Sequence, residues 1–131
     1  MPENPAEDAQ ITVLSKLVRQ YSSWGTVFLC IESADPPNML VDRVSFITGT
    51  CVRLCHTSVW DSNGVGRLVD PDTGGHAVAV GVSHVKQVSD EEFEMEGGYS
   101  CGGLCAASFH YRVRREGTGW KILSEEMLWI S

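Results

Sequence analysis

The clearest hydrophobic pattern in the chain is the helical spacing of apolar residues in its first segment. These residues form one stripe, as expected of an amphipathic helix: Ile11, Leu14, Leu17, Val18 and Tyr21. Asn4 and Pro5 precede the stripe and are residue types preferred at the N-cap and the first helical position. The pattern therefore predicts a helix that begins after Asn4 and ends before Gly25.

Two shorter apolar segments follow this helix. Residues 26–32 form an almost continuous apolar run rich in strand-forming residues, which predicts a strand buried on both faces. After Pro36 and Pro37 the helical spacing returns and lasts until Gly49. We expect a second helix here with four apolar side chains facing inward: Met39, Leu40, Val44 and Ile47. Residues 51–56 are at best a short strand before a polar loop at 61–66.

From residue 67 onward the pattern alternates, which is typical of antiparallel strands. Three valines at 78, 80 and 82 share one face, and the glutamates at 92, 94 and 96 share a wet face opposite apolar residues. The next strand places five residues on one face: Cys105, Ala107, Phe109, Tyr111 and Val113. A glycine hairpin at 116–119 leads to the last strand. The sequence predicts one α+β domain, residues 1–131, with two N-terminal helices packed on a curved antiparallel sheet of four to six strands.

Charge and composition exclude some partners. The 131 residues are 43% hydrophobic, enough for a real core, and they carry a net charge of −7. This sign disfavours binding to nucleic acid or to anionic lipid. An acidic start without an apolar segment, and apolar runs too short to cross a bilayer, predict a cytoplasmic protein without membrane contact.

Five cysteines allow several chemistries. An odd number in a cytoplasmic chain favours reduced thiols that pack as small apolar groups. The pairs Cys51/Cys55 and Cys101/Cys105 offer two alternatives, a zinc site or, for the second pair, a redox or disulfide role. Residues four apart on an extended strand are ~13 Å apart, so only a bend at Gly102-Gly103 would bring the second pair together. We expect no metal and no cofactor.

The segment Tyr99-Ser-Cys-Gly-Gly-Leu-Cys105 and the later Gly119-Trp-Lys-Ile122 carry a resemblance. Two helices followed by a meander of long strands, a glycine turn and this Trp resemble the nuclear transport factor two-like (cystatin-like, cone-shaped) superfamily. The resemblance covers residues 67–131 by pattern and the helices by order only. This half is also similar to small uncharacterised bacterial proteins with a Tyr-x-Cys-Gly-x-Leu-Cys element. The resemblance implies a curved sheet around a helix and a conical cavity that serves ligand binding, acid–base catalysis or dimerisation.

Residues of such a cavity are the candidates for a ligand pocket: His84, Tyr99, Cys101, Cys105, Phe109, Tyr111 and Trp120. Acid–base catalysis would pair His84 or His110 with Asp90 or Asp61. His84 shares the parity of the inward valines, whereas His110 shares that of two arginines and is expected to face water or a partner. No catalytic motif is present, and the glycine pairs 97–98 and 102–103 are interpreted as bulges. Catalytic residues therefore stay unknown.

The last strand points to self-association. Trp129 has the parity of Met127 and the opposite parity to Leu128 and Ile130, so both faces of this strand end are apolar. Met127 and Trp129 are the interface candidates of a homodimer. We expect a non-catalytic module that binds a small apolar molecule or a protein. The alternative is a small cofactor-independent hydrolase, isomerase or dehydratase.

Overall fold

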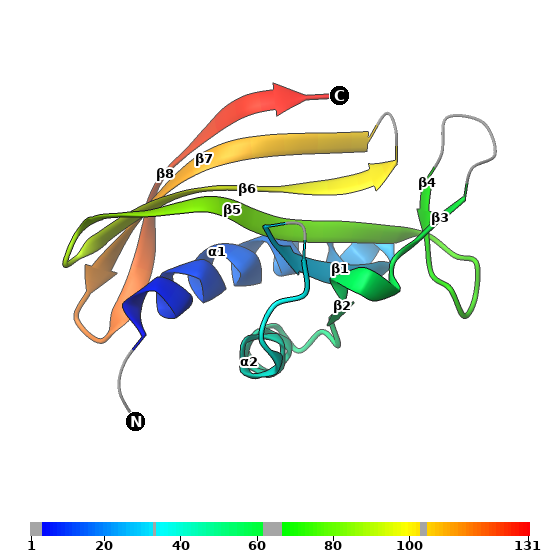
Figure 1. Cartoon of the computed structure of the whole chain (residues 1–131), viewed down its shortest axis with the longest axis horizontal. Coiled ribbons are helices and arrows are strands. Elements are labelled where there is room, and N and C mark those ends of the chain that lie inside the picture. Colours follow the sequence, from blue (N-terminus) through cyan, green and yellow to red (C-terminus); the bar gives the residue numbers. More distant parts are fainter. Residues whose placement is uncertain (1–3, 33, 62–66, 103–104) are drawn as a thin grey trace.

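The computed structural model describes residues 4–32, 34–61, 67–102 and 105–131. It has the predicted α+β class, with both helices on one side of a mixed sheet (Figure 1). The helices are α1 (Pro5–Tyr21) and α2 (Asn38–Thr48), with short 3-10 turns η1 (Ser22–Trp24) and η2 (Cys55–Thr57). The strands are β1 (Thr26–Ile31), β2 (Arg53–Leu54), β3 (Val59–Asp61), β4 (Arg67–Val69), β5 (Ala77–Ser89), β6 (Glu92–Gly102), β7 (Cys105–Glu116) and β8 (Gly119–Ile130).

Helix α1 forms where the apolar stripe predicts it. The side chain of Asn4 caps the helix by accepting a hydrogen bond from the backbone N–H of Glu7 at 3.1 Å. Helix α2 ends at Gly49, whose φ of 69° lies in the left-handed region that favours glycine. No helix in the described part of the chain is both long and apolar enough to cross a membrane.

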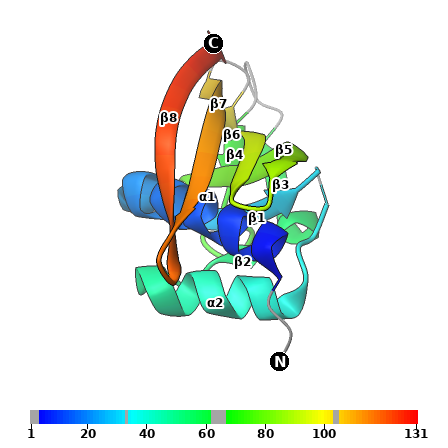
Figure 2. The same ribbon diagram turned by 90° about the vertical axis from the view of Figure 1, so that its left-hand side faces the viewer.

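The buried side of α2 differs from the prediction. Leu40, Val41 and Val44 are buried, whereas Met39 and Ile47 are exposed. The reason is the position of α2 in the fold. One side of α2 packs against α1, and α2 lies farther from strands β5 to β8 than α1 does (Figure 2). A narrow contact buries only the centre of the apolar stripe and leaves its two margins in solvent.

The sheet is mixed rather than antiparallel. Its main ladder runs β2-β1-β5-β6-β7-β8, with β1 parallel to both β2 and β5 and the remaining pairs antiparallel. The short β4 joins β6 at a single pair, Arg67 with Gly102, and β3 pairs with β4. The antiparallel meander of β5 to β8 agrees with the sequence prediction. The correction comes from β1, which lies between the two helices in sequence and enters the sheet beside β5.

Strands β5 to β8 have two distinct faces. We call the side that packs on α1 the covered face and the opposite side the open face. The covered face supplies most of the core, including Met95 and Tyr111, which meet Leu14 and Leu17 of α1. Strand β1 is buried on both sides as predicted, because Val27 and Leu29 join this core while Phe28 packs with Leu68 and Ala77.

Two β-bulges on β8 move the side chains between them to the face opposite to the one expected of a regular strand, and the second bulge restores the regular parity at Trp129. Arg112 pairs with Ser124 and Val113 with Ile122, which leaves Leu123 as an extra residue. In the same way Ser108 pairs with Trp129 and Phe109 with Met127, which leaves out Leu128. Each bulge shifts the following side chains to the other face. Met127 and Ile130 therefore lie on the covered side, and Trp129 lies on the open face, so the predicted shared face of Met127 and Trp129 is wrong.

Candidate functional site

The pocket residues predicted from the resemblance do not converge on one cavity. Tyr111 is only 1% exposed and is a core residue, and Phe109 and Trp120 are half-buried beside the same core. Burial, together with the carboxylate of Glu125, raises the pKa of the Tyr111 phenol well above its ordinary value. Lys16 lies 5.9 Å from the centre of the Tyr111 ring and forms an ion pair with Glu125 at 2.5 Å.

Tyr99 belongs to an aromatic cluster at the end of α1. Its ring centre lies 4.3 Å from that of Tyr21 and 5.5 Å from that of Trp24. A small pocket of about 260 Å³ next to this cluster is lined by Trp24, His76, Ala77 and Cys101. Of the predicted pocket residues it contains Cys101, whereas Tyr99 lines a different hollow, so the predicted residues do not share one cavity.

The histidines form carboxylate pairs, but with different partners from those predicted. His84 does not point inward: its side chain is 75% exposed, and its Nδ1 lies 2.7 Å from Glu96. The reason is a bulge at His84, where φ is 52° and the β5–β6 register shifts. His110 lies on the open face, as predicted, 4.0 Å from Glu94. The side chain of Asp61 lies outside the described residues.

Four cysteines form disulfides, Cys30 with Cys55 and Cys101 with Cys105, so the prediction of free thiols is wrong for these four. Strand β6 ends at Gly102 and β7 begins at Cys105, and the Cα atoms of Cys101 and Cys105 lie 5.1 Å apart. Gly103, which is part of the predicted bend and bulge at 102–103, lies outside the described residues. Cys51 is free and exposed. Among the described residues, no group of three or more His, Cys, Asp or Glu side chains is arranged to hold a metal ion.

A groove of about 460 Å³ lies on the open face and is larger than the pocket beside Trp24. Its axis follows one row of paired residues across five strands. Consecutive register pairs give this row: Cys30, Gly81, Gly98, Ser108 and Trp129. The floor consists of two glycines and a serine, while the Cys30–Cys55 disulfide and the Trp129 side chain stand at its two ends. We call this hollow the open-face groove.

Close approach of neighbouring strands requires the glycines of the floor. A Cβ on Gly81 would lie 2.6 Å from the carbonyl oxygen of Cys30, and one on Gly98 would overlap the carbonyl oxygen of Ala107. Gly97 faces α1, where a Cβ would lie 3.0 Å from the Tyr111 ring. The predicted bulge at 97–98 is wrong, because the β6–β7 register is continuous there and shifts only between Ser100 and Gly102.

The end of β8 borders the groove and is unusually apolar for an exposed segment. Trp129 is 53% exposed, and Met127, Leu128 and Ile130 are exposed with it. Within the described residues β8 pairs with β7 alone, so its outer edge is open to solvent. An open, apolar strand edge favours association with another chain unless something covers it.

The other half of the open face is charged. Glu92, Glu94 and Glu96 of β6 stand opposite Arg114, Arg112 and His110 of β7. Arg112 donates to the carboxylate of Glu92 at 2.9 Å. The open face therefore changes along its strands from a region of mostly small, uncharged residues at the groove to a region of paired charges.

Comparison with family models, with curated proteins and with solved structures finds no match. The groove is the feature that sequence reasoning missed. The feature that could have revealed it is a row of small residues on neighbouring strands, and this row can be recognised only when the strand register is known.

Proposed function

We propose that the chain is a non-catalytic binding module, that it docks an apolar partner on its open face, and that this partner is a second copy of the same chain. The observation that carries the proposal is the exposed Trp129 beside a groove whose floor is Gly81, Gly98 and Ser108. The Trp129 side chain projects from the same face on which the groove forms a hollow, so one face carries both a projecting apolar group and a site that could receive one.

This combination suits a symmetric dimer. A two-fold interface uses the same patch on both chains, so the patch must be complementary to itself. With Trp129 as the projection and the groove as the hollow, each copy offers what the other copy accepts. Tryptophan is among the residues that most often anchor interfaces, because its ring buries a large apolar area at little cost in side-chain entropy.

The charged half of the open face limits how the copies meet. Burying Glu92, Glu94 and Glu96 against the same residues of another copy would require removing water from like charges. Docking centred on the groove leaves Glu92 and Glu94 outside it, where they stay hydrated, and meets Glu96, which lines the groove and already pairs with His84. The resemblance to the nuclear transport factor two-like superfamily remains part of the proposal, supported by the sheet that lies against α1 (Figure 2).

Sedimentation equilibrium of Trp129→Glu against the unmodified chain tests the proposal. We expect the unmodified chain to be a dimer and Trp129→Glu to be a monomer with an unchanged far-ultraviolet circular dichroism spectrum. Phe46→Glu is the matched control, because Phe46 is 89% exposed on α2, away from the groove, and its replacement should leave the dimer intact. A monomeric unmodified chain would contradict the proposal, and so would equal dissociation in both variants.

A second variant tests the hollow rather than the projection. Ser108 is half-buried on the open face, and Ser108→Trp would fill the groove without entering the core. We expect this variant to fold and to sediment as a monomer although its Trp129 is intact. Persistence of the dimer would mean that the groove does not receive the partner's side chain.

A further inference from the structure

We propose that the Cys30–Cys55 disulfide is an exchangeable bond that oxidises dithiols which enter the open-face groove. It lines the groove, and both of its cysteines are half-buried. This activity is separate from the proposed dimer, although both use the groove. It is therefore measured in Trp129→Glu, in which the groove stays open whether or not the unmodified chain dimerises.

The direction of the bond follows from the strand register. Strands β1 and β2 are parallel, with Leu29 beside Leu54, so Cys30 and Cys55 occupy the next positions along the two chain segments. On its other side Cys30 pairs with Gly81. The disulfide therefore reaches from β1 toward the β2 side, and Cys30 is the cysteine that adjoins Gly81 on the floor of the groove.

This direction decides which sulfur an incoming thiolate reaches. Exchange proceeds by attack of a thiolate on one sulfur while the other sulfur leaves, through a mixed disulfide. Attack in line with the bond from the groove side reaches the sulfur of Cys30 and expels that of Cys55. Gly81 has no side chain to obstruct this approach, and its neighbour Gly98 extends the open path.

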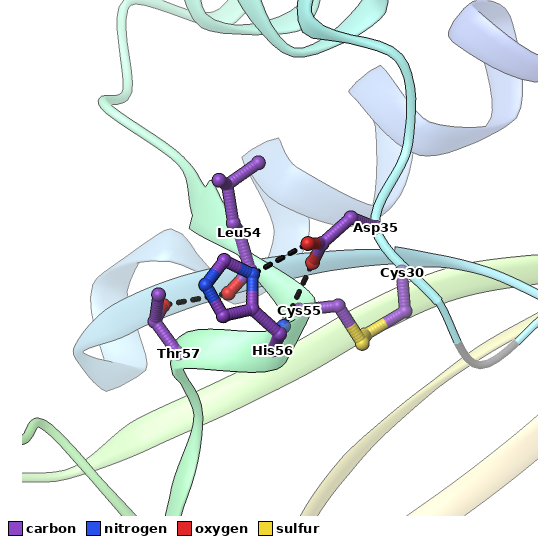
Figure 3. The surroundings of a disulfide bond; sticks show 6 residues. All are labelled: Cys30, Asp35, Leu54, Cys55, His56 and Thr57. Atoms are coloured by element: carbon purple, nitrogen blue, oxygen red, sulfur yellow. Dashed lines mark hydrogen bonds and ion pairs between the residues drawn. A yellow bond between two sulfur atoms is a disulfide. The ribbon is translucent and has the colours of Figure 1, made fainter.

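The residue that follows the leaving sulfur is held in place. Asp35 accepts a hydrogen bond from the backbone N–H of His56 at 2.8 Å, and its second oxygen lies 2.5 Å from His56 Nδ1 (Figure 3). The backbone hydrogen bond from His56 is the main cause that lowers the pKa of Asp35, so this carboxyl is ionised at neutral pH. The imidazole that Asp35 holds in this pair follows Cys55 directly in the chain, and a cation at this position would stabilise the thiolate and improve it as a leaving group.

The complete reaction balances with a dithiol as the reductant. Its first thiolate bonds to the Cys30 sulfur while the Cys30–Cys55 bond breaks, and the electron pair goes to Cys55, which then takes a proton. The second thiolate of the reagent attacks the first sulfur of the reagent and releases Cys30 as a thiolate, which also takes a proton. The dithiol leaves as a disulfide, and the protein gains two thiols.

The second disulfide provides an internal control. Cys101 and Cys105 lie at the hairpin end of β6 and β7, and Cys101 packs against the core of the covered face. Neither residue lines the open-face groove. The same reagent in the same sample therefore meets one disulfide in the groove and one outside it.

The first test maps the mixed disulfide. Trp129→Glu is treated briefly with 2-mercaptoethanol, quenched with acid, alkylated and analysed by peptide mass. We expect the 2-mercaptoethanol adduct on Cys30 and the alkyl group on Cys55. We also expect the Cys30–Cys55 disulfide to open on the order of tenfold faster than the Cys101–Cys105 disulfide. Adducts mainly on Cys55, or opening no faster than at the control disulfide, would overturn the proposal.

The second test concerns His56. His56→Ala, which removes the side chain paired with Asp35, is expected to slow opening of the Cys30–Cys55 disulfide by about threefold to tenfold, whereas His56→Lys, which places an ammonium group at this position, retains most of the rate. Equal losses in both variants, or no loss in either, would overturn the role assigned to His56.

Discussion

The covered and open faces of strands β5 to β8 are built from the same segments, yet they meet opposite demands. On β7, Tyr111 fills the space against α1, while its neighbours His110 and Arg112 face solvent on the other side. Packing against the helix requires large side chains on the covered face. The groove on the open face requires small residues instead, such as Gly98 and Ser108. The comparison shows that the small residues of the open face are not needed to fit α1, and that their shared row is itself the feature to explain.

The largest expected difference between the faces is in stability. Tyr111→Ala removes a ring that is 1% exposed, so we expect a loss of about 3–5 kcal/mol in the free energy of unfolding. Ser108→Ala, on the same strand but on the open face, should change it by less than about 0.5 kcal/mol. Urea denaturation of both variants measures the difference. Similar midpoints for the two variants would contradict the division into faces.

A smaller effect is expected from the floor of the groove. Gly98→Ala places a Cβ against the carbonyl oxygen of Ala107, so β6 and β7 must separate locally. We expect a loss of about 1–3 kcal/mol in the free energy of unfolding. Gly119→Ala is the matched control, because its Cβ would lie 3.9 Å from the carbonyl oxygen of Glu116, which is an ordinary van der Waals distance. If the two variants unfold at the same urea concentration, the close approach at Gly98 is not a constraint.

The covered face should also respond to alkaline pH. The pKa of Tyr111 is raised in the folded chain, mainly by burial, so the folded state holds its proton at a pH where the unfolded state releases it. The resulting stability is complete below about pH 10, the ordinary tyrosine value, and falls as pH rises above it. The slope is at most about 1.4 kcal/mol per pH unit for this group.

Tyr111→Phe is the variant that isolates this contribution. We expect a shallower decline of the unfolding free energy between pH 9 and pH 11 than in the unmodified chain. Tyr21, whose pKa is also raised by burial, should leave part of the decline in place. An identical decline in the two proteins would show that Tyr111 does not hold its proton more tightly in the folded state.

Local patterns predicted much of the covered side. The stripe of α1, its Asn4 cap and the alternation from Phe93 to Tyr99 depend on residues close in sequence, so they can be recognised before any fold is known. The two-sided burial of β1 was visible for the same reason. Its parallel pairing with β5 was not, because pairing between distant segments leaves no local pattern.

The open side depended on information that the sequence does not display. The bulges at Leu123 and Leu128 place Met127 and Trp129 on opposite faces, and a bulge exists only relative to a partner strand. Likewise, the Cys30–Cys55 disulfide joins residues 25 positions apart, whereas the C-x3-C spacing had drawn attention to Cys51 and Cys55. Long-range register therefore determined every part of the groove that sequence patterns failed to predict.

The most direct test of the account is a photo-cross-link from position 129. p-Benzoylphenylalanine replaces Trp129, the protein is mixed with an equal amount of ¹⁵N-labelled unmodified chain, and the cross-linked peptides are mapped by mass. We predict links between light and heavy chains that join position 129 to the groove floor of the other copy, at Gly98 or Ser108. Links confined to a single chain would contradict the claim that the open face receives a second copy.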